Sequence, residues 1–388
     1  MGCCLALNLA RSGVDVTLVD QNAEPVQGAS RWNEGKIHLG YLYGADSTLG
    51  TTRHILTGGL RFGVELGRLL GVDLTGHSTA DDDLYLIHRD SVVDLPAVRA
   101  QFEAVDDLVR GHPDAGGYLV DVTRATAVEM RRGDLDGLAG PAVVGAFRVP
   151  ERSVQTGWLA DQLAAAVVAE PRITLRMGTR VVRVGQEQAD RLRVVGEPQF
   201  AEDFDVVVNA LWEGRLAIDV TAGLEPDHVW SHRFRRCAFV RTREVVDVPS
   251  AIVAVGPFGD VKNYNGRDFY LSWYPLGLVA EGSEVAPPEP VPLSGRGAEA
   301  FTHELRQALE GVMPRVGEVF DAAASTVVEG GYVFARGQGS IGDPRSALHR
   351  RDAFGVTRLG NYVSVDTGKY STAPWMARLT AAQVADSL

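Results

Sequence analysis

The sequence has few of the features that mark a secreted, membrane-spanning or metal-binding protein. It contains only three cysteines in 388 residues, of which Cys3 and Cys4 are adjacent and Cys237 is isolated. This spacing supplies neither a metal-ligand set nor a disulfide framework. No apolar run reaches the roughly 18 residues that a membrane span needs, and no basic region opens the chain as in a signal peptide. We therefore expect a cytoplasmic protein with three structural thiols, no metal and no transmembrane segment.

Positive charge is also in short supply. The 38 Lys and Arg residues are outnumbered by 50 Asp and Glu residues, which gives a formal net charge of −12. Such a chain would repel a phosphate backbone, so nucleic acid is not an expected partner. The 45% hydrophobic and 23% charged content is ordinary for a globular enzyme, and the length suffices for two domains.

The first half of a nucleotide-binding motif is missing from the opening "MGCCLALNLARSGVDVTLVD". The stretch predicts an apolar helix ended by Gly13 and then a short buried strand ending at Asp20. In a dinucleotide-binding fold, Gly2 would be the last glycine of G-x-G-x-x-G, and Asp20 would accept hydrogen bonds from the adenosine ribose. Alternatively, Gly2 is only the neighbour of the start residue and Asp20 a turn residue. We expect the chain to be short by roughly 8 to 12 residues, a strand and the start of its loop.

Alternating helix and strand patterns recur at both ends and in the middle of the chain. "VQTGWLADQLAAAVVAEP" predicts an amphipathic helix, and "FDVVVNALWEG" predicts a buried parallel strand. Residues 228–275 instead alternate in the manner of an antiparallel sheet. The fold class is therefore α/β with an α+β second domain, in which a Rossmann-like nucleotide-binding domain is interleaved with an antiparallel-sheet substrate domain. The expected limits are 1–75, 145–222 and 330–388 for the first domain, and 76–144 and 223–329 for the second.

Several motifs in one order resemble the FAD-dependent oxidoreductases of the D-amino acid oxidase superfamily. They are the partial fingerprint at Gly2, "GASRWNEGKIHLGYLY", "ERSVQTGWLADQLAAAVVAEPRITLRMGTRVVRV", "DVVVNALWEG" and "DTGKYSTAP". Within the second motif, "NEGKIHLGYLY" is most similar to the corresponding loop of L-2-hydroxyglutarate dehydrogenases. The resemblance implies FAD as the cofactor and a domain pair of the kind described above.

The resemblance also implies which residues hold FAD. Asp20 would bind the ribose, Ala29 and Ser30 the pyrophosphate, and the backbone of Val181 and Val182 the adenine. Gly368 to Thr372 would cover the flavin pyrimidine, where a helix N-terminus faces the charge that collects on reduction. The whole expected cofactor set is Gly2, Asp20, Gln21, Ala29, Ser30, Asn33, Gly35, Val181, Val182, Asn209, Ala210, Trp212, Gly368, Lys369, Tyr370, Ser371 and Thr372.

Two departures from the family pattern bear on the cofactor. Leu211 and Trp212 stand where the family usually has Ala-Gly, so contacts there are expected to be rearranged. Trp32 stands where some relatives attach flavin through a histidine, so we predict non-covalent FAD.

Four residues are candidates for the chemistry, each with a plainer alternative. His38 matches a histidine of the hydroxyglutarate-dehydrogenase loop and is a candidate base or hydrogen-bond donor, or it merely fixes the loop. Arg336 is a candidate carboxylate clamp or a surface ion-pair residue. Tyr270, with Trp273 and Tyr274, would wall the pocket or pack in the core. Lys369 would act beside the flavin or cap a helix at the surface. Lys36 and Asn33 share the His38 loop. Each is a further candidate for the chemistry, and the plainer alternatives, a solvated cation and a loop-capping amide, fit equally well.

The favoured function is hydride transfer to FAD from the C–N or C–O carbon of a small, anionic amine, amino acid or hydroxy acid. Oxygen or an electron-carrier protein would reoxidise the flavin. The alternatives are an NAD-dependent dehydrogenase, which uses the same fingerprint, and a flavoprotein-like binding protein without turnover. The sequence leaves the substrate, the acceptor and the oligomeric state open.

Overall fold

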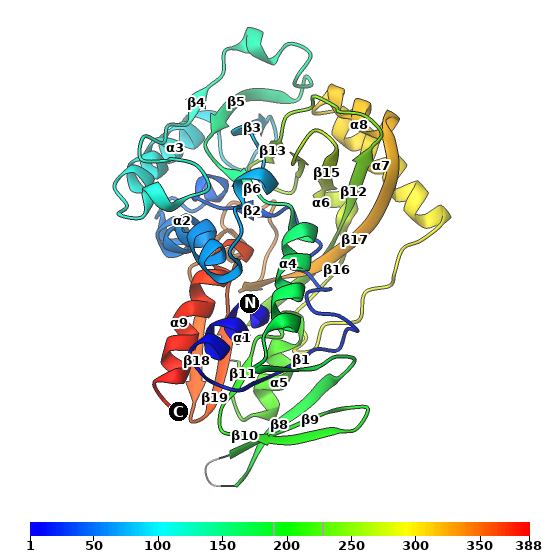
Figure 1. The fold of residues 1–388 in the computed structure, drawn as a ribbon. Coiled ribbons are helices and arrows are strands. Elements are labelled where there is room, and N and C mark those ends of the chain that lie inside the picture. Colours follow the sequence, from blue (N-terminus) through cyan, green and yellow to red (C-terminus); the bar gives the residue numbers. More distant parts are fainter. Residues whose placement is uncertain (189–190, 227–228) are drawn as a thin grey trace.

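A computed structural model describes residues 1–188, 191–226 and 229–388 of the chain. It has mixed α/β architecture, as the sequence predicts. Figure 1 shows a large sheet in the upper half, flanked by helices, and a group of smaller sheets and helices in the lower half. In the described residues, no helix is both long and apolar enough to cross a membrane.

The lower half is built from βα units at the two ends and the middle of the chain. Helix α1 (Gly2–Arg11) leads into β1 (Val16–Val19), with Gly13 at a φ of 91° between them, as the sequence predicts. β1 pairs in parallel with β7 (Ile173–Arg176), and β11 (Val207–Asn209) pairs in parallel with β19 (Tyr362–Asp366), whose other neighbour is β18 (Gly355–Leu359). The last helix, α9 (Ala373–Ala385), packs beside α1 (Figure 1).

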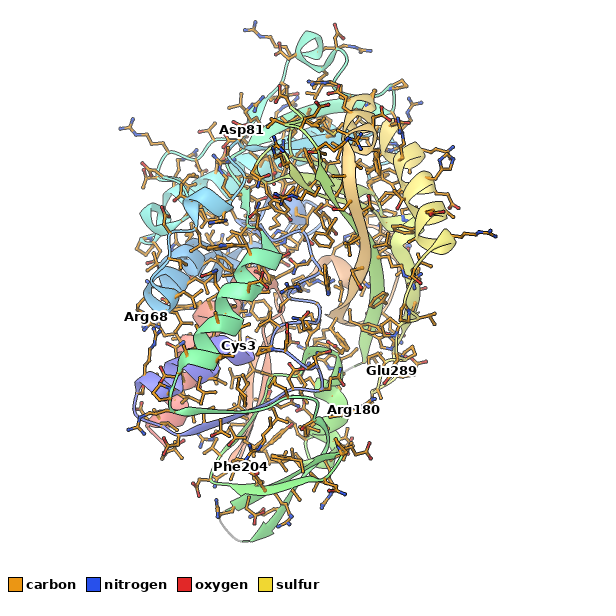
Figure 2. All side chains as sticks on the ribbon, turned by 45° about the vertical axis from the view of Figure 1, so that its right-hand side comes forward. Cys3, Arg68, Asp81, Arg180, Phe204 and Glu289 are labelled. Atoms are coloured by element: carbon orange, nitrogen blue, oxygen red, sulfur yellow. The ribbon has the colours of Figure 1, made fainter. Side chains whose placement is uncertain are left out.

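A three-stranded antiparallel sheet forms the lowest part of Figure 1. It consists of β8 (Arg180–Gln188), β9 (Arg191–Glu197) and β10 (Phe200–Phe204), and it has a small core of its own with α5 (Arg215–Thr221). An ion pair of 2.5 Å between Arg180 and Glu289 joins it to the proline-rich segment, and both residues are labelled in Figure 2.

The upper half is a nine-stranded sheet. Its order is β16 (Leu278–Gly282), β12 (Trp230–Thr242), β15 (Asp268–Trp273), β14 (Gly259–Asn263), β13 (Ala251–Ala254), β3 (Asp83–His88), β5 (Val143–Val149) and β4 (Val128–Glu129), with β17 (Ala323–Arg336) also paired to β12. The pairs are antiparallel except β13 with β3, which is parallel and which the sequence did not indicate. The expected domain limits at 145 and 330 fall inside the strands β5 and β17. The division of the chain into two domains at the expected limits stays a prediction.

Helices cover the sheet and connect it to the lower half. α7 (Arg296–Glu310) and α8 (Gly317–Asp321) pack in the core cluster on the outer face of the large sheet, at the right of Figure 1. α2 (Gly50–Leu70), α3 (Leu95–Arg110) and α4 (Thr156–Ala169) lie in the other core cluster, and the short α6 (Tyr274–Gly277) follows β15. The two-residue strands β2 (Lys36–Ile37) and β6 (Arg152–Ser153) pair between the halves.

Candidate active site

A pair of glycines in α2 brings two distant loops together. A Cβ on Gly59 would overlap the carbonyl oxygen of His38, and one on Gly58 would lie 2.8 Å from the Cα of Thr372. Because neither glycine has a side chain, the loop after β2 and the loop before α9 both lie against one turn of this helix. The candidate flavin residues at 33–38 and 368–372 therefore meet, although more than 300 residues separate them.

Two of the candidate nucleotide residues, Gly2 and Ala210, meet at the N-terminal end of α1. A Cβ on Gly2 would lie 3.8 Å from Leu18 and 3.9 Å from Ala210, so the start of α1 is in contact with β1 and the end of β11. Asp20 is half-buried and accepts hydrogen bonds of 2.9 Å from the backbone and side chain of Asn22. Burial raises the pKa of Asp20 against these hydrogen bonds. Gln21, Ala29 and Ser30 continue this chain path, and all but the exposed Gln21 are half-buried.

Asn209 and Trp212 are held by the protein itself. The side-chain nitrogen of Asn209 bonds to Asp219 and to the backbone oxygen of Arg215, at 2.8 and 2.9 Å. Trp212 donates 2.7 Å to the carbonyl of Tyr332, and its φ of 50° reflects the tight turn after β11. On β8, Val181 packs into the core of the hairpin sheet, while Val182 is 37% exposed.

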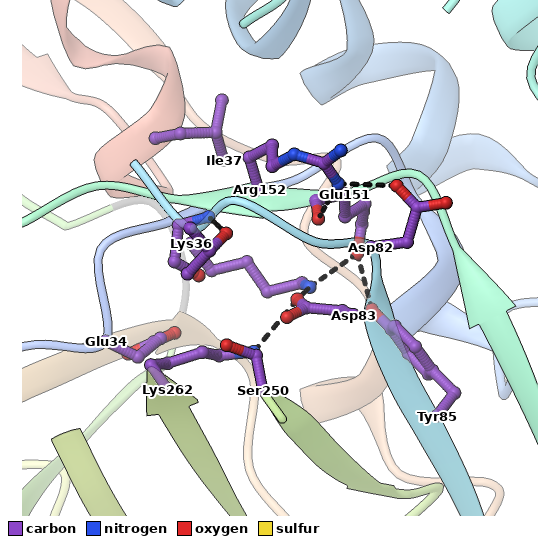
Figure 3. Close-up of polar contacts among 12 residues, drawn as sticks. Glu34, Lys36, Ile37, Asp82, Asp83, Tyr85, Glu151, Arg152, Ser250 and Lys262 are labelled. Atoms are coloured by element: carbon purple, nitrogen blue, oxygen red, sulfur yellow. Dashed lines mark hydrogen bonds and ion pairs between the residues drawn. The ribbon is translucent and has the colours of Figure 1, made fainter. Parts of the chain in front are cut away.

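The loop from Asn33 to Gly40 is fixed by a buried charge network, shown in Figure 3. Lys36 lies between Asp83, with which it forms a very short ion pair, and Glu151 at 2.8 Å, while Lys262 binds Asp83 at 2.9 Å. Glu151 also accepts hydrogen bonds from the hydroxyl of Tyr85 and the backbone of Leu39, both at 2.5 Å, and from Gly40 at 3.2 Å. Asn33 caps the same loop by accepting from Gly35 at 2.8 Å.

His38 and Lys369 both lie near the ring of Tyr43. The His38 ring is 5.5 Å from that of Tyr43, and the Lys369 ammonium is 5.4 Å from the same ring. Burial lowers the pKa of His38, and the positive charges of Lys369, Lys36 and Lys262 lower it further. Burial, followed by the charge of Arg351, lowers the pKa of Lys369 to about 7. Nδ1 of His38 and the hydroxyl of Tyr43 are buried and have no partner in the described residues.

Arginines on β12 face this region from the large sheet. Arg233 is 3% exposed and donates through Nη1 to the Tyr274 hydroxyl at 2.9 Å, while its Nε and Nη2 have no partner among the described residues. Arg235, two residues along on the same face, lies 4.7 Å above the Tyr274 ring and donates to Ser272 at 3.3 Å. The sequence analysis missed both. Their signal was the alternation of "HRFRRC", which places these arginines on one side of a strand.

The aromatic residues of β15 divide between the two faces of the sheet. Tyr270 is 4% exposed and packs edge-on against Phe239, whose other ring neighbour is Trp32 of the early loop. Tyr274 lies on this inner side, whereas Trp273 packs into the cluster of α7 and α8 on the outer side. Of the two alternatives for Trp273, the structure shows core packing, because successive strand residues point to opposite faces.

Arg336 ends β17 with an exposed side chain and lines a cavity of about 380 Å³. Gly368, next to Lys369, lines the same cavity, which therefore reaches the loop before α9. Ser371 and Thr372 are buried there, with no partner for the Ser371 hydroxyl in the described residues, and Tyr370 packs on Phe62 at 5.6 Å. No group of three or more His, Cys, Asp or Glu side chains in the described residues is placed to hold a metal.

The model of the family DAO, FAD dependent oxidoreductase, matches residues 1–383. The chain belongs to this DAO family. Its members are FAD-dependent oxidoreductases, so the protein is an enzyme that uses FAD. No curated protein sequence matches it significantly.

Solved structures share the fold at low sequence identity. Glycine oxidase from Geobacillus kaustophilus superposes with a TM-score of 0.66 at 16% identity, over 99% of this chain and 90% of that one. Iminodiacetate oxidase from Chelativorans sp. BNC1 gives 0.62 at 15%, over 99% and 91%. L-α-glycerophosphate oxidase from Mycoplasma pneumoniae, with FAD bound, gives 0.64 at 12%, over 99% and 93%. The closer likeness of the early loop to L-2-hydroxyglutarate dehydrogenases is not supported by these comparisons and stays a prediction.

The residues of this DAO-family enzyme fit FAD. At the nucleotide end, α1 begins without a side-chain cap and next to Asp20, an arrangement suited to a pyrophosphate and a ribose. At the flavin end, Tyr43, Ser371 and His38 each have a buried polar atom without a partner in the described residues. Buried polar atoms are normally hydrogen-bonded, so these groups mark where a polar cofactor and substrate are received.

Proposed function

We propose that this enzyme oxidises the carbon that bears the amino or hydroxyl group of a small carboxylic acid, with FAD as the hydride acceptor. The observation that carries the proposal is the buried, unpartnered edge of Arg233. The named activities of glycine oxidase and iminodiacetate oxidase, both of which act on amino acids with carboxylates, support it.

Arg233 has the geometry of a carboxylate-binding site. Its free Nε and Nη2 lie on one edge of the guanidinium, and this edge takes the two oxygens of a carboxylate. Arg99 uses the same two nitrogens for Glu129, at 2.8 Å each. Arg233 has no such partner in the described residues, and a buried guanidinium without a counter-charge is costly. A substrate carboxylate removes that cost, while Tyr274 fixes the third nitrogen.

Lys369 and His38 supply the proton chemistry in this proposal. With a pKa of about 7, Lys369 is partly neutral at neutral pH and can take the proton that leaves the substrate's amine or hydroxyl. His38 stays neutral because its pKa is lowered by burial, so one ring nitrogen accepts a hydrogen bond. FAD, when bound, accepts the hydride. The substrate is an amino acid or a hydroxy acid, and the resemblance of the early loop "NEGKIHLGYLY" favours a hydroxy acid.

The remaining cofactor and acceptor statements belong to the same proposal. We infer non-covalent FAD because Trp32 occupies the position of the attaching histidine and its indole nitrogen donates 3.0 Å to the Gln27 carbonyl. Oxygen or an electron carrier reoxidises the flavin. Arg336 stays a candidate for binding acidic groups at the outer end of the cavity.

The test is anaerobic bleaching of the flavin absorbance by pooled amino acids, hydroxy acids and amines. We expect one acid pool to bleach it, and an Arg233→Gln variant to need about 10- to 100-fold more substrate, as expected for a lost charge-assisted contact. Arg241→Gln is the matched control, because Arg241 lies on the same strand but pairs with Asp268 at the surface. Bleaching by uncharged amines alone, or an unchanged KM in Arg233→Gln, would refute the carboxylate assignment. A folded, FAD-loaded protein that no pool bleaches would favour a binding protein without turnover.

A further inference from the structure

Several buried cations in the described residues are paired with carboxylates. Lys36 and Lys262 pair with Asp83 and Glu151, as described above. Arg215 pairs with Asp219 and Asp366, each at 3.2 Å. In each of these pairs the fold places a carboxylate beside an interior cation, which offsets the cost of burying its charge.

Arg351 has no carboxylate partner among the described residues, and in this it resembles Arg233, Arg235 and Lys369 of the candidate site. Its side chain is buried, at 9% exposure, and Nη1 donates only to the backbone carbonyl of Phe334, at 3.1 Å. No carboxylate in the described residues lies within 4 Å of it. Burial, and next the like charge of Arg233, lower the pKa of Arg351 to about 10. Two guanidinium groups thus repel each other in the interior. Neither has a carboxylate within 4 Å in the described residues, and the more distant charge of Asp366 only partly opposes the lowering of the Arg351 pKa.

The position of Arg351 is fixed by its neighbours. The backbone nitrogen of Arg351 donates a hydrogen bond of 2.9 Å to the hydroxyl of Thr51 in α2, which fixes the backbone at this residue. Phe334, which receives the guanidinium, lies on β17 opposite His232, the residue before Arg233 on β12. The two arginines therefore lie near the same stretch of the large sheet. Arg233 is part of β12, and Arg351 reaches β17 from the loop before β18.

Arg351 also lines the cavity of about 380 Å³ that reaches Gly368. The cavity's two carboxylates are already engaged. Asp352 pairs with the neighbouring Arg350, while Asp366 accepts from Gly368 at 2.8 Å and pairs with Arg215. Positive charge is thus left over in a space large enough for a small acid.

We propose that Arg351 is a second anion subsite, so that the substrate carries two acidic groups, one held by Arg233 and the other by Arg351 in the cavity. The second group is a carboxylate or a phosphoryl group, since both match a guanidinium. The inference rests on the proposed oxidation of a small carboxylic acid, and it narrows the substrate class from simple amino or hydroxy acids to diacids.

The test is calorimetric binding of unreactive acids to the FAD-loaded enzyme, with flavin absorbance as a second readout. The probes are propionate and butyrate against succinate, glutarate and 3-phosphonopropionate. We expect at least one diacid to bind about tenfold or more tightly than the monoacids, because a charge-assisted contact is added. The last probe distinguishes a phosphoryl from a carboxylate preference.

Variants locate the effect. In Arg351→Gln we expect the diacid advantage to disappear while monoacid affinity changes less than about twofold, because Arg233 is retained. Arg350→Gln is the matched control: it lines the same cavity but its charge is compensated by Asp352, so the diacid advantage should persist. The Arg351→Lys variant, which keeps the positive charge, should retain part of the diacid advantage.

The outcomes separate this inference from the proposed function. If diacids bind no better than monoacids to the wild-type enzyme, the second subsite is refuted, whereas the proposed function stands if a monoacid bleaches the flavin. Diacid preference that survives in Arg351→Gln also refutes it. If no acid of either kind binds and none reduces the flavin, both proposals fail.

Discussion

The buried network around Glu151 allows a quantitative prediction about stability. Glu151 is fully buried and receives the charge of Lys36 together with hydrogen bonds from Tyr85 and the backbone of Leu39 and Gly40. Burial acts to lower the pKa of Lys36, but the charges of Asp83 and Glu151 outweigh it, so the pKa is raised and the lysine stays charged. The two lysines and two carboxylates of the network sum to zero charge.

Glu151→Gln leaves one uncompensated buried positive charge. Breaking a buried pair in this way costs about 3–5 kcal/mol. Since 1 kcal/mol shifts Tm by about 2–4 °C in chains of a few hundred residues, we expect Tm to fall by about 6 °C or more. In the double variant Lys36→Met with Glu151→Gln, the remaining Lys262 and Asp83 are again neutral together. The double variant should therefore be more stable than Glu151→Gln alone.

Thermal unfolding of the FAD-loaded enzyme, followed by circular dichroism, checks this prediction. The matched control is Glu129→Gln, which removes an exposed ion pair with Arg99 and should change stability by less than about 1 kcal/mol. A double variant whose loss equals or exceeds the sum of the single losses would refute the reasoning, because it would show that Lys36 and Glu151 do not compensate each other.

Three further predictions follow from the site. Gly59→Ala should destabilise the enzyme by about 1–3 kcal/mol in chemical unfolding, because the added Cβ overlaps the His38 carbonyl. Gly67→Ala on the same helix should be neutral or stabilising, because its Cβ would lie 3.5 Å from the nearest atom. Equal effects of the two substitutions would contradict this prediction. The value of kcat/KM should rise with pH through about 7, as Lys369 loses its proton. The Lys369→Met variant should be slow, and its kcat/KM should not change with pH over this range. A variant with the same pH dependence as the wild-type enzyme would exclude Lys369 as the base. Acid precipitation should release all FAD into the supernatant, and flavin retained in the pellet would contradict the non-covalent assignment at Trp32.

The sequence predicts local structure well and the site only in part. The sequence pattern locates α1, followed by Gly13, and α4, because these signals lie within each segment. The parallel pairing of β13 with β3 joins segments about 165 residues apart, and nothing local in either strand encodes its partner. The order of strands in the large sheet is undetermined in the sequence for the same reason.

Charge balance in the interior is equally invisible along the chain. In the sequence, the arginines of "HRFRRC" look like those of any polar edge strand. Only the folded structure shows that Arg233 lacks a carboxylate partner in the described residues, whereas Arg99 of α3 has one. Lys36, expected as a solvated cation, is 2% exposed, since the fold brings Asp83 and Glu151 to it from distant positions. Candidates for a site can be proposed from residue type, but whether a charge is already satisfied is a property of the assembled fold.

The packing of α9 against α1, and of β19 against β11, has a consequence for synthesis. The nucleotide half needs the first ten residues and the last thirty at the same time. The ribosome delivers these segments in order, and domains generally fold as units. Ser371, one of the residues proposed to receive the flavin, therefore emerges after every strand of the large sheet. The large sheet can assemble before β19 and α9 have been synthesised, whereas the nucleotide half cannot be complete until both are present.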